Sequence, residues 1–431
     1  MKGGKLIGEG TYGCAFYPHL PCEGNHTYPG SVGKIFSNDA SLIEEEDLSR
    51  FTQSIDPTSA FTIPLKGKCV VKKNSITKQD KQSKCSKFTQ SIRIPQKQLL
   101  YDYGGIDLQK FSRSYAVTNV NFYIDDLIPI LLPVFDGISK LVAKGWTHTD
   151  IKPANMVYEP NKNQIYLIDF GMMSSIHTIH QLKHVLVHPY IYYPPEFLVM
   201  NAFKKNQQVS SLLHNDFMRR FSAKFISFLN KYRYFSVNTE IKTFMKKVST
   251  MNKDSFGNKF NNSYVHKLDS YSLGMSLLEI VYNLEAHDAL RIRDINVFEM
   301  FVKLLARMTH MNPELRLDPV MAYTKLELIV DKSPISKPCI ELSGKEIKQR
   351  LEKANLPKYG TKKVMCERLE KHEQEKSTKS KPCIELSGKE IKQRLENANL
   401  PKYGTKKVMC ERLEKHQKTV LQLNSHHESL L

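Results

Sequence analysis

Two short polar clusters in the middle of the chain constrain its fold and its chemistry more than any other stretch. The first cluster is His148–Asn155 (HTDIKPAN) and the second is Ile168–Gly171 (IDFG). Two short apolar segments, 156–158 and 165–168, lie between them and predict a pair of strands. We expect this pair to bring four polar side chains to the mouth of one cleft: Asp150, Lys152, Asn155 and Asp169.

Phosphoryl transfer needs side chains of these four types. A carboxylate such as Asp150 orients the attacking hydroxyl, and a cation such as Lys152 stabilises the phosphoryl group that moves. An amide and a carboxylate, here Asn155 and Asp169, hold Mg²⁺ through their oxygen atoms. The competing explanation is a loop that is rich in Asp and Asn and has no catalytic role. Both clusters are present, in an order and at a spacing that would bring the four side chains to one cleft, and this favours phosphoryl transfer.

At these residues the chain resembles the eukaryotic-type protein kinase superfamily, whose catalytic loop and DFG element the two clusters match. The resemblance implies an α+β fold of two lobes over residues 1–330, with ATP and Mg²⁺ as cofactors and proteins as substrates. Lys152 stands two residues after Asp150, which is the pattern of serine/threonine kinases.

A glycine-rich stretch near the start, Leu6–Phe16 (LIGEGTYGCAF), predicts a phosphate-binding turn, because glycine lets the backbone approach a phosphate closely. A second extended segment, 32–36, follows it in place of the helix that a dinucleotide fold would have. In the kinase resemblance Lys34 contacts the α- and β-phosphates, and its apolar neighbours favour this role over that of a surface lysine. The ATP-binding residues implied here are Gly8, Glu9, Gly10, Thr11, Gly13 and Lys34.

A kinase also needs a glutamate that pairs with this lysine. The acidic run 44–47 opens a segment with a helical pattern, and we select Glu46 as the partner from its distance to Pro57. Glu45 and Asp47 remain alternatives. Acidic residues are also favoured at the start of a helix by its dipole, which explains part of the run.

Residues 98–105 (QLLYDYGG) predict a strand that ends in the hinge between the two lobes. By resemblance, the backbones of Asp102 and Gly104 bind adenine, Tyr101 is the gatekeeper and Asp107 reaches the ribose.

Three residues further along the chain are expected to support the site without taking part in the chemistry. The resemblance implies an ion pair between Glu196 and Arg316, and hydrogen bonds from the catalytic-loop backbone to Asp269.

The chain departs from the kinase pattern in two places. Thr149 replaces the usual arginine before the catalytic aspartate, so a phosphate on Ser174 or Ser175 would lack its main partner. A basic, Phe-rich insertion, about 201–262, separates the activation segment from the helix that begins near Asp269. It is either a docking element or an insertion that only packs on the large lobe.

The composition predicts a globular chain that neither crosses a membrane nor enters the secretory pathway. The formal net charge is +19, which suggests contact with a polyanion such as nucleic acid, or else a solvated lysine-rich surface. The eight cysteines are scattered, and in a cytosolic or nuclear chain we expect free thiols. From residue 336 onward, 22 Lys and Arg stand against 13 Asp and Glu, or +9, so the charge is densest in the tail.

The tail contains a repeat. Residues 336–372 recur as 380–416 with one difference, Lys353 against Asn397, and the polar linker 373–379 separates the copies. The apolar spacing predicts a helix, a turn and a second helix in each copy. The pattern resembles the SAP motif, a small DNA-binding module, although a hairpin that binds protein is the alternative. The lysines that would approach DNA are Lys345, Lys348, Lys358, Lys362, Lys363, Lys389, Lys392, Lys402, Lys406 and Lys407.

A closer resemblance over about residues 1–330 is to serine/threonine kinases of large nucleocytoplasmic DNA viruses. It rests on the run 55–64 (IDPTSAFTIP) and on the run 188–196 (HPYIYYPPE). It implies a viral protein in the cytoplasmic factory of the host cell or packaged in the virion, with the nucleus less favoured. The sequence thus predicts a DNA-tethered serine/threonine kinase. The alternative is a scaffold with an inactive kinase fold.

Overall fold

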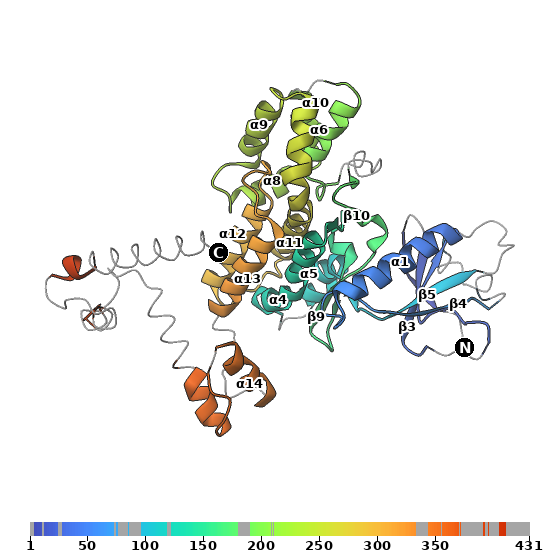
Figure 1. Cartoon of the computed structure of the whole chain (residues 1–431), viewed down its shortest axis with the longest axis horizontal. Coiled ribbons are helices and arrows are strands. Elements are labelled where there is room, and N and C mark those ends of the chain that lie inside the picture. Colours follow the sequence, from blue (N-terminus) through green and yellow to red (C-terminus); the bar gives the residue numbers. More distant parts are fainter. Residues whose placement is uncertain are drawn as a thin grey trace, which may run out of the picture. The chain divides into compact units, whose positions relative to one another are not determined.

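The computed structural model divides into two compact units, Met1–Pro334 and Ile335–Leu431 (Figure 1). None of the described helices is long and apolar enough to cross a membrane. The structure describes residues 4–10, 13–24, 28–72, 75, 85, 96–118, 122–179, 190–207, 209, 211–332, 344–354, 356–369, 371, 391–392, 395 and 405–410.

The first unit begins with an antiparallel five-stranded sheet in the order β1-β2-β3-β5-β4. Apolar side chains on one face of β2 and β3, including Phe16 and Ile35, are fully buried in a small core of their own. The alternation of buried and exposed residues in these strands explains why they pair in one register. The strands are β1 (Lys5–Glu9), β2 (Gly13–Tyr17), β3 (Ser31–Phe36), β4 (Leu65–Val70) and β5 (Lys97–Asp102).

One long helix, α1 (Asp39–Ile55), packs on this sheet. It begins where the Asn38 side chain accepts a hydrogen bond of 2.8 Å from the Ser41 N–H, which satisfies a backbone donor that the helix leaves unpaired. After the helix, the buried carboxylate of Asp56 accepts hydrogen bonds from the backbone of 60–62. These contacts fix the path by which the chain returns to the sheet.

Two disulfides cross the sheet region, which contradicts the prediction of free thiols. Cys14 is bonded to Cys85 and Cys22 to Cys69, with Cα–Cα distances of 6.0 and 5.7 Å. Backbone pairing of Cys22 with Val71 explains the second bond, because it places Cys22 beside the end of β4. None of the described cysteines has a free thiol. Sequence spacing could not reveal these pairs, since their partners are distant along the chain.

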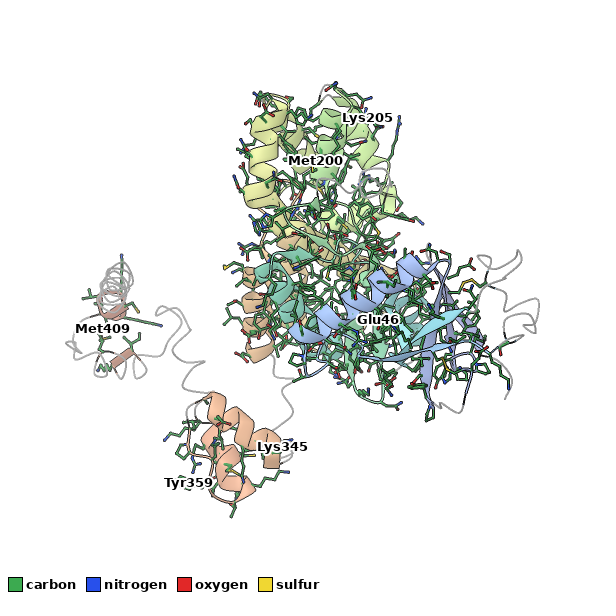
Figure 2. All side chains as sticks on the ribbon, turned by 45° about the vertical axis from the view of Figure 1, so that its right-hand side comes forward. Glu46, Met200, Lys205, Lys345, Tyr359 and Met409 are labelled. Carbon is green, nitrogen blue, oxygen red and sulfur yellow. A yellow bond between two sulfur atoms is a disulfide. The ribbon has the colours of Figure 1, made fainter. Side chains whose placement is uncertain are left out.

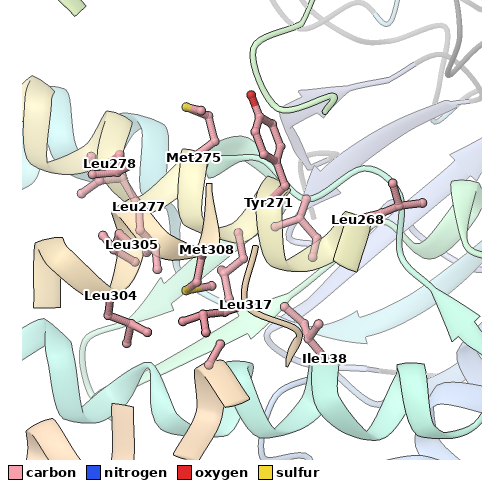
Figure 3. Packing of buried hydrophobic residues seen from close by; sticks show 14 of the residues in the cluster. Ile138, Leu268, Tyr271, Met275, Leu277, Leu278, Leu304, Leu305, Met308 and Leu317 are labelled. Atoms are coloured by element: carbon pink, nitrogen blue, oxygen red, sulfur yellow. The ribbon is translucent and has the colours of Figure 1, made fainter. Parts of the chain in front are cut away.

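A mainly helical lobe follows the sheet. Its centre is α11 (Leu268–Ala286), which is buried on nearly all sides and therefore apolar around most of its circumference. Figure 3 shows Tyr271, Met275 and Leu278 among the packed side chains of this core. The surrounding helices are α4 (Ile124–Ile130), α5 (Leu132–Ala143), α12 (Ile295–Met308) and α13 (Pro319–Lys332).

Short elements between the sheet and the helical lobe carry the polar clusters. The predicted strand pair is present as β8 (Met156–Glu159) and β9 (Gln164–Leu167), which pair antiparallel. The remaining elements are β6 (Ile106–Asp107), α2 (Leu108–Lys110), η3 (Phe111–Tyr115), α3 (Ala116–Thr118), β7 (Trp146–Thr147), η4 (Pro153–Asn155), η5 (Phe170–Met172) and β10 (Ser174–Ser175).

The insertion is helical and packs into the core of this lobe. Its side chains Phe225, Phe244 and Phe260 are buried in the same core as α11. Arg233 and Glu240 form a buried ion pair of 2.8 Å within it. Of the two alternatives, the structure supports packing on the large lobe. The helices of the insertion and of the segments that flank it are α6 (Pro195–Lys204), α7 (Ser211–Met218), α8 (Ala223–Asn230), α9 (Val237–Val248), α10 (Lys253–Lys259), η7 (Phe260–Tyr264) and η8 (Val265–Lys267).

The second unit contains a helical hairpin in the first repeat. Helix α14 (Gly344–Lys353) and a second helix over 362–369 bury Ile347, Leu351 and Met365 between them. The buried face of the second helix is formed by Met365, Cys366 and Leu369, whereas Val364 is 43% exposed. In the second repeat, Ile391, Leu395, Met409 and Cys410 are buried as well.

Candidate active site

Lys34 on β3 lies at the centre of an ion-pair cluster that joins three elements. Its Nζ donates to Glu45 Oε1 on α1 at 2.7 Å and to Asp169 Oδ1 at 2.9 Å. Burial by itself lowers the pKa of Lys34, but the charges of Asp169 and Glu45 outweigh it and hold this pKa above its usual value. In turn, Lys34 lowers the pKa of Asp169. Both groups therefore stay ionised at neutral pH.

The partner of Lys34 is Glu45, so the prediction of Glu46 is wrong. Glu46 instead forms ion pairs of 2.9 Å with Arg50 and 2.8 Å with Lys68, and its pKa is lowered by these hydrogen bonds, with Lys68 contributing most (Figure 2 labels Glu46). Both glutamates are buried on the inner face of α1. Spacing from Pro57 could not separate two adjacent residues. The helical period would have indicated Glu45, because it lies on the same face of the helix as Leu42, Ser49 and Thr52.

The catalytic loop holds Asp150, Lys152 and Asn155 together. Asp150 Oδ2 accepts hydrogen bonds from Lys152 Nζ at 2.7 Å and from Asn155 Nδ2 at 2.8 Å. Asn155 Nδ2 also donates to the Asp150 carbonyl at 2.9 Å. The short turn η4, with Pro153 at its first position, creates this proximity. One carboxylate is thus oriented by a cation and an amide.

Asn155 and Asp169 fit a site for Mg²⁺. The backbone N–H of Ile168 donates to the Asn155 carbonyl at 3.0 Å, so the two residues flank the same end of the β8–β9 pair. The amide nitrogen of Asn155 faces Asp150, which leaves its oxygen for a cation, and the Asp169 side chain is 41% exposed. Hard oxygen donors of this kind suit Mg²⁺. Asp169 has a left-handed backbone, with φ of 64°, which aims its side chain away from the strand.

Asp269 binds the backbone of the catalytic loop, as predicted. Its carboxylate accepts hydrogen bonds from the backbone N–H of His148 at 2.7 Å and of Thr149 at 3.0 Å. Asp269 is buried in the first turn of α11, the most buried helix of the lobe. The loop that carries Asp150 is therefore attached to a rigid element.

A second buried contact, between Glu196 and Arg316, forms as predicted. Arg316 Nη1 and Nη2 donate to the two carboxylate oxygens of Glu196 at 2.5 and 3.0 Å, and both side chains are fully buried. Such a bidentate ion pair fixes the relative orientation of the two side chains as well as their distance. It connects the start of α6 to the segment before α13.

The glycine-rich turn joins β1 to β2. Gly10 N–H donates to the Gly13 carbonyl at 2.9 Å, and a Cβ at Gly13 would lie 1.9 Å from the Ile35 carbonyl oxygen. Gly13 thus permits the close approach of β2 to β3, on which Lys34 stands. Gly8 and Glu9 are exposed in β1, and Thr11 lies outside the described residues.

The hinge begins at Asp102, the last residue of β5. Its side chain pairs with Lys66 at 2.5 Å, and its backbone stands opposite Ser31 of β3 in the ladder. Gly104 has no room for a side chain, since a Cβ would lie 2.3 Å from Ile63 Cδ1. Behind the hinge, the Tyr101 hydroxyl and Ser49 Oγ are 3.0 Å apart, and burial raises the pKa of Tyr101.

Asp107, the residue expected at the ribose, is engaged by its own helix. It caps α2 by accepting from the Lys110 N–H at 2.8 Å and pairs with the Lys110 side chain at 2.9 Å. A ribose would have to share this carboxylate.

The model of the protein kinase domain matches residues 103–342, just over half of the chain. The chain belongs to the protein kinase family. No curated protein matches it. The match begins immediately after Asp102, so it covers the hinge and the helical lobe of this kinase. The assignment of the sheet lobe rests on its strand order and on the Lys34–Glu45 pair.

The kinase match ends inside the first repeat, a few residues beyond the end of the first unit at Pro334. In that repeat, the five lysines selected for DNA contact are exposed: Lys345, Lys348, Lys358, Lys362 and Lys363. Figure 2 shows Lys345 and Tyr359 on this hairpin, and Tyr359 is 75% exposed. In the second repeat Lys392, Lys406 and Lys407 are exposed, and Lys389 and Lys402 lie outside the described residues.

Proposed function

We propose that this kinase is an active, ATP-dependent serine/threonine protein kinase that uses Mg²⁺. The observation that carries the proposal is the simultaneous formation of two clusters. Lys34 contacts both Glu45 and Asp169, while Asp150 contacts both Lys152 and Asn155. An inactive scaffold has no need for either cluster, because ionised groups are costly to bury without a function or a partner.

Each residue has a distinct part in phosphoryl transfer. Asp150 orients the substrate hydroxyl and accepts its proton, and Lys152 stabilises the charge on the phosphoryl group. Lys34, kept cationic by its two carboxylates, binds the α- and β-phosphates. When bound by Asn155 and Asp169, Mg²⁺ neutralises charge on the phosphates. Acceptance of Ser and Thr is supported by Lys152, which matches the serine/threonine pattern.

The test measures transfer of radioactive phosphate from ATP to a basic protein. Asp150→Asn should lower kcat by at least about 100-fold, because the amide cannot accept the proton. Asp136→Asn is the matched control, since Asp136 pairs with Lys140 on α5, and it should keep wild-type activity. Equal rates for Asp150→Asn and wild type would reject the mechanism. Phosphate found on tyrosine alone would reject the serine/threonine assignment.

Binding of nucleotide separates the active kinase from the inactive scaffold. Thermal stability of the wild type should rise with Mg²⁺-ATP, because a ligand that binds only the folded state stabilises it by mass action. No shift at millimolar Mg²⁺-ATP would favour the scaffold.

We further propose that the tandem repeats tether the kinase to DNA. The support is a small apolar core that leaves the lysines of the first repeat on the surface. Lysines contact phosphates without reading sequence, and two linked modules gain affinity from proximity.

The variant Lys362→Gln/Lys363→Gln should weaken binding to duplex DNA and reduce the salt dependence of that binding. Lys224→Gln, an exposed lysine of α8, should leave both unchanged. Equal DNA affinity of a chain truncated after Lys332 would reject the tether.

The viral relationship and the cytoplasmic factory stay proposals that rest on the sequence resemblance. The two disulfides count against a cytosolic location, because disulfides are rare in a reducing cytosol. Fluorescence imaging of infected cells should place the protein at cytoplasmic sites of DNA replication, and a uniformly nuclear signal would reject this location.

A further inference from the structure

Thr149 has an unusual conformation for its residue type. It is 2% exposed and its φ is 63°, in the left-handed region. Side chains branched at Cβ rarely adopt this region, so the surroundings must hold it there. The Thr149 N–H is bound to Asp269, and its hydroxyl donates to the carbonyl oxygen of Met172. One buried residue thus connects the catalytic loop to the segment that follows Asp169.

The bond to Met172 continues an existing ladder. β7 and β10 pair antiparallel, with Thr147 opposite Ser174 and Trp146 opposite Ser175. The same register, carried two residues further, places Thr149 opposite Met172. At this point the Thr149 N–H is already bound to Asp269 and cannot serve the ladder. The side-chain hydroxyl supplies the hydrogen bond in its place.

This last hydrogen bond lies next to the metal-binding residue. Met172 is the final residue of η5, the turn that directly follows Asp169, and Met173 N–H donates to Phe170 at 2.8 Å to close that turn. Fixing the Met172 carbonyl therefore fixes the turn that aims Asp169 toward Lys34.

We propose that Thr149 is a positioning residue whose hydroxyl holds the Asp169 segment in the catalytic arrangement without phosphorylation of the activation segment. This inference rests on the proposed kinase activity. In kinases with an arginine at this position, the resemblance implies a phosphate as its partner. Here, a neutral hydroxyl makes a direct bond to the backbone, so the arrangement is complete as the chain folds.

The test compares three variants in the full-length chain. Thr149→Val keeps the shape and loses the donor, and Thr149→Ser keeps the donor and loses the methyl group. Thr149→Ala also loses the donor but relieves the strain of a branched side chain, so it serves if Thr149→Val fails to fold. We expect Thr149→Val and Thr149→Ala to lower kcat about tenfold and to require more Mg²⁺ for half-maximal rate, because a partly buried carbonyl loses its donor. Thr149→Ser should keep both values within about twofold of the wild type.

Hydrogen exchange gives a readout that does not depend on activity. The amides of 172–176 should exchange faster in Thr149→Val and Thr149→Ala than in the wild type and Thr149→Ser. Phosphatase treatment of the wild type should leave its rate of phosphate transfer unchanged. The inference is overturned by equal kcat and exchange rates for Thr149→Val and the wild type, by equal losses of kcat in all three variants, or by loss of activity after phosphatase treatment. If the wild type transfers no phosphate, the proposed function fails, while the exchange comparison still decides the role of the hydroxyl.

Discussion

At the scale of single residues, Glu45 and Glu46 show that adjacent positions on a helix can have different partners. Both carboxylates are buried on α1, but Glu45 faces Lys34 and Glu46 faces Lys68. The placement of Asp150, Lys152, Asn155 and Asp169 at one end of the β8–β9 pair was predictable, because they form a motif within a short stretch of sequence. The ion-pair partner was not, because its identity depends on how α1 rotates against a sheet built from distant segments.

This difference gives the first prediction. Glu45→Gln should lower kcat/KM by about 10- to 100-fold, since a charged hydrogen bond to the half-buried Lys34 is lost. Glu46→Gln, which removes a charge from the adjacent position, should change kcat/KM by less than about threefold, because its partners are largely exposed. Steady-state kinetics at several ATP concentrations measure both. The opposite ranking of the two variants would contradict the assignment.

At the scale of elements, the insertion is part of the large lobe and not an appendage to it. Glu314, in the segment before α13, accepts from Lys247 on α9, from Lys259 at 3.0 Å on α10 and from Tyr264 at 3.1 Å. The sequence indicated helices here but left docking and packing open. Packing could not be derived from composition, because a Phe-rich segment suits either a core or a surface for a partner.

The second prediction concerns acid stability of this contact. Hydrogen bonds, mainly from Lys247, lower the pKa of Glu314 from 4.5 to about 2. A lowered pKa stabilises the folded state above the unfolded value, and this contribution is lost as the pH falls through the folded value. Wild type should therefore melt above Glu314→Gln at pH 7, and the gap should close as the pH falls from 4.5 toward 2.

Thermal unfolding of both chains across this pH range measures the effect. Glu299→Gln serves as the control, because Glu299 pairs with Lys303 on the exposed face of α12. A gap between wild type and Glu314→Gln that stays constant down to pH 2 would show that the carboxylate charge has no part in it. Because the contact is partly exposed, we expect a small gap.

At the scale of the whole molecule, the fold class and the order of the parts were predictable, since periodicity and motifs are local. The pairing of cysteines was not, because it depends on which strands become neighbours. The disulfide from Cys14 to Cys85 begins on β2, directly after Gly13 of the glycine-rich turn. The sheet lobe has a small core of its own, so we expect the two disulfides to contribute a large part of its stability.

The third prediction follows from this dependence. Cys14→Ser/Cys85→Ser should destabilise the sheet lobe by about 2–5 kcal/mol, because the unfolded chain gains conformational freedom. Thermal unfolding should also show a lower midpoint for the wild type after reduction with dithiothreitol. Mass spectrometry after alkylation under denaturing conditions counts the thiols. Reactive thiols at 14, 22, 69 and 85 before reduction would contradict the pairing.

The two repeats, nearly identical in sequence, lie in a compact unit separate from the kinase unit. A module that has its own small core can be gained or lost without disturbing the buried pairs that hold the catalytic loop. On the proposed function, an added copy of this segment would raise the affinity of the kinase for DNA through proximity, while every residue of the candidate active site stays unchanged.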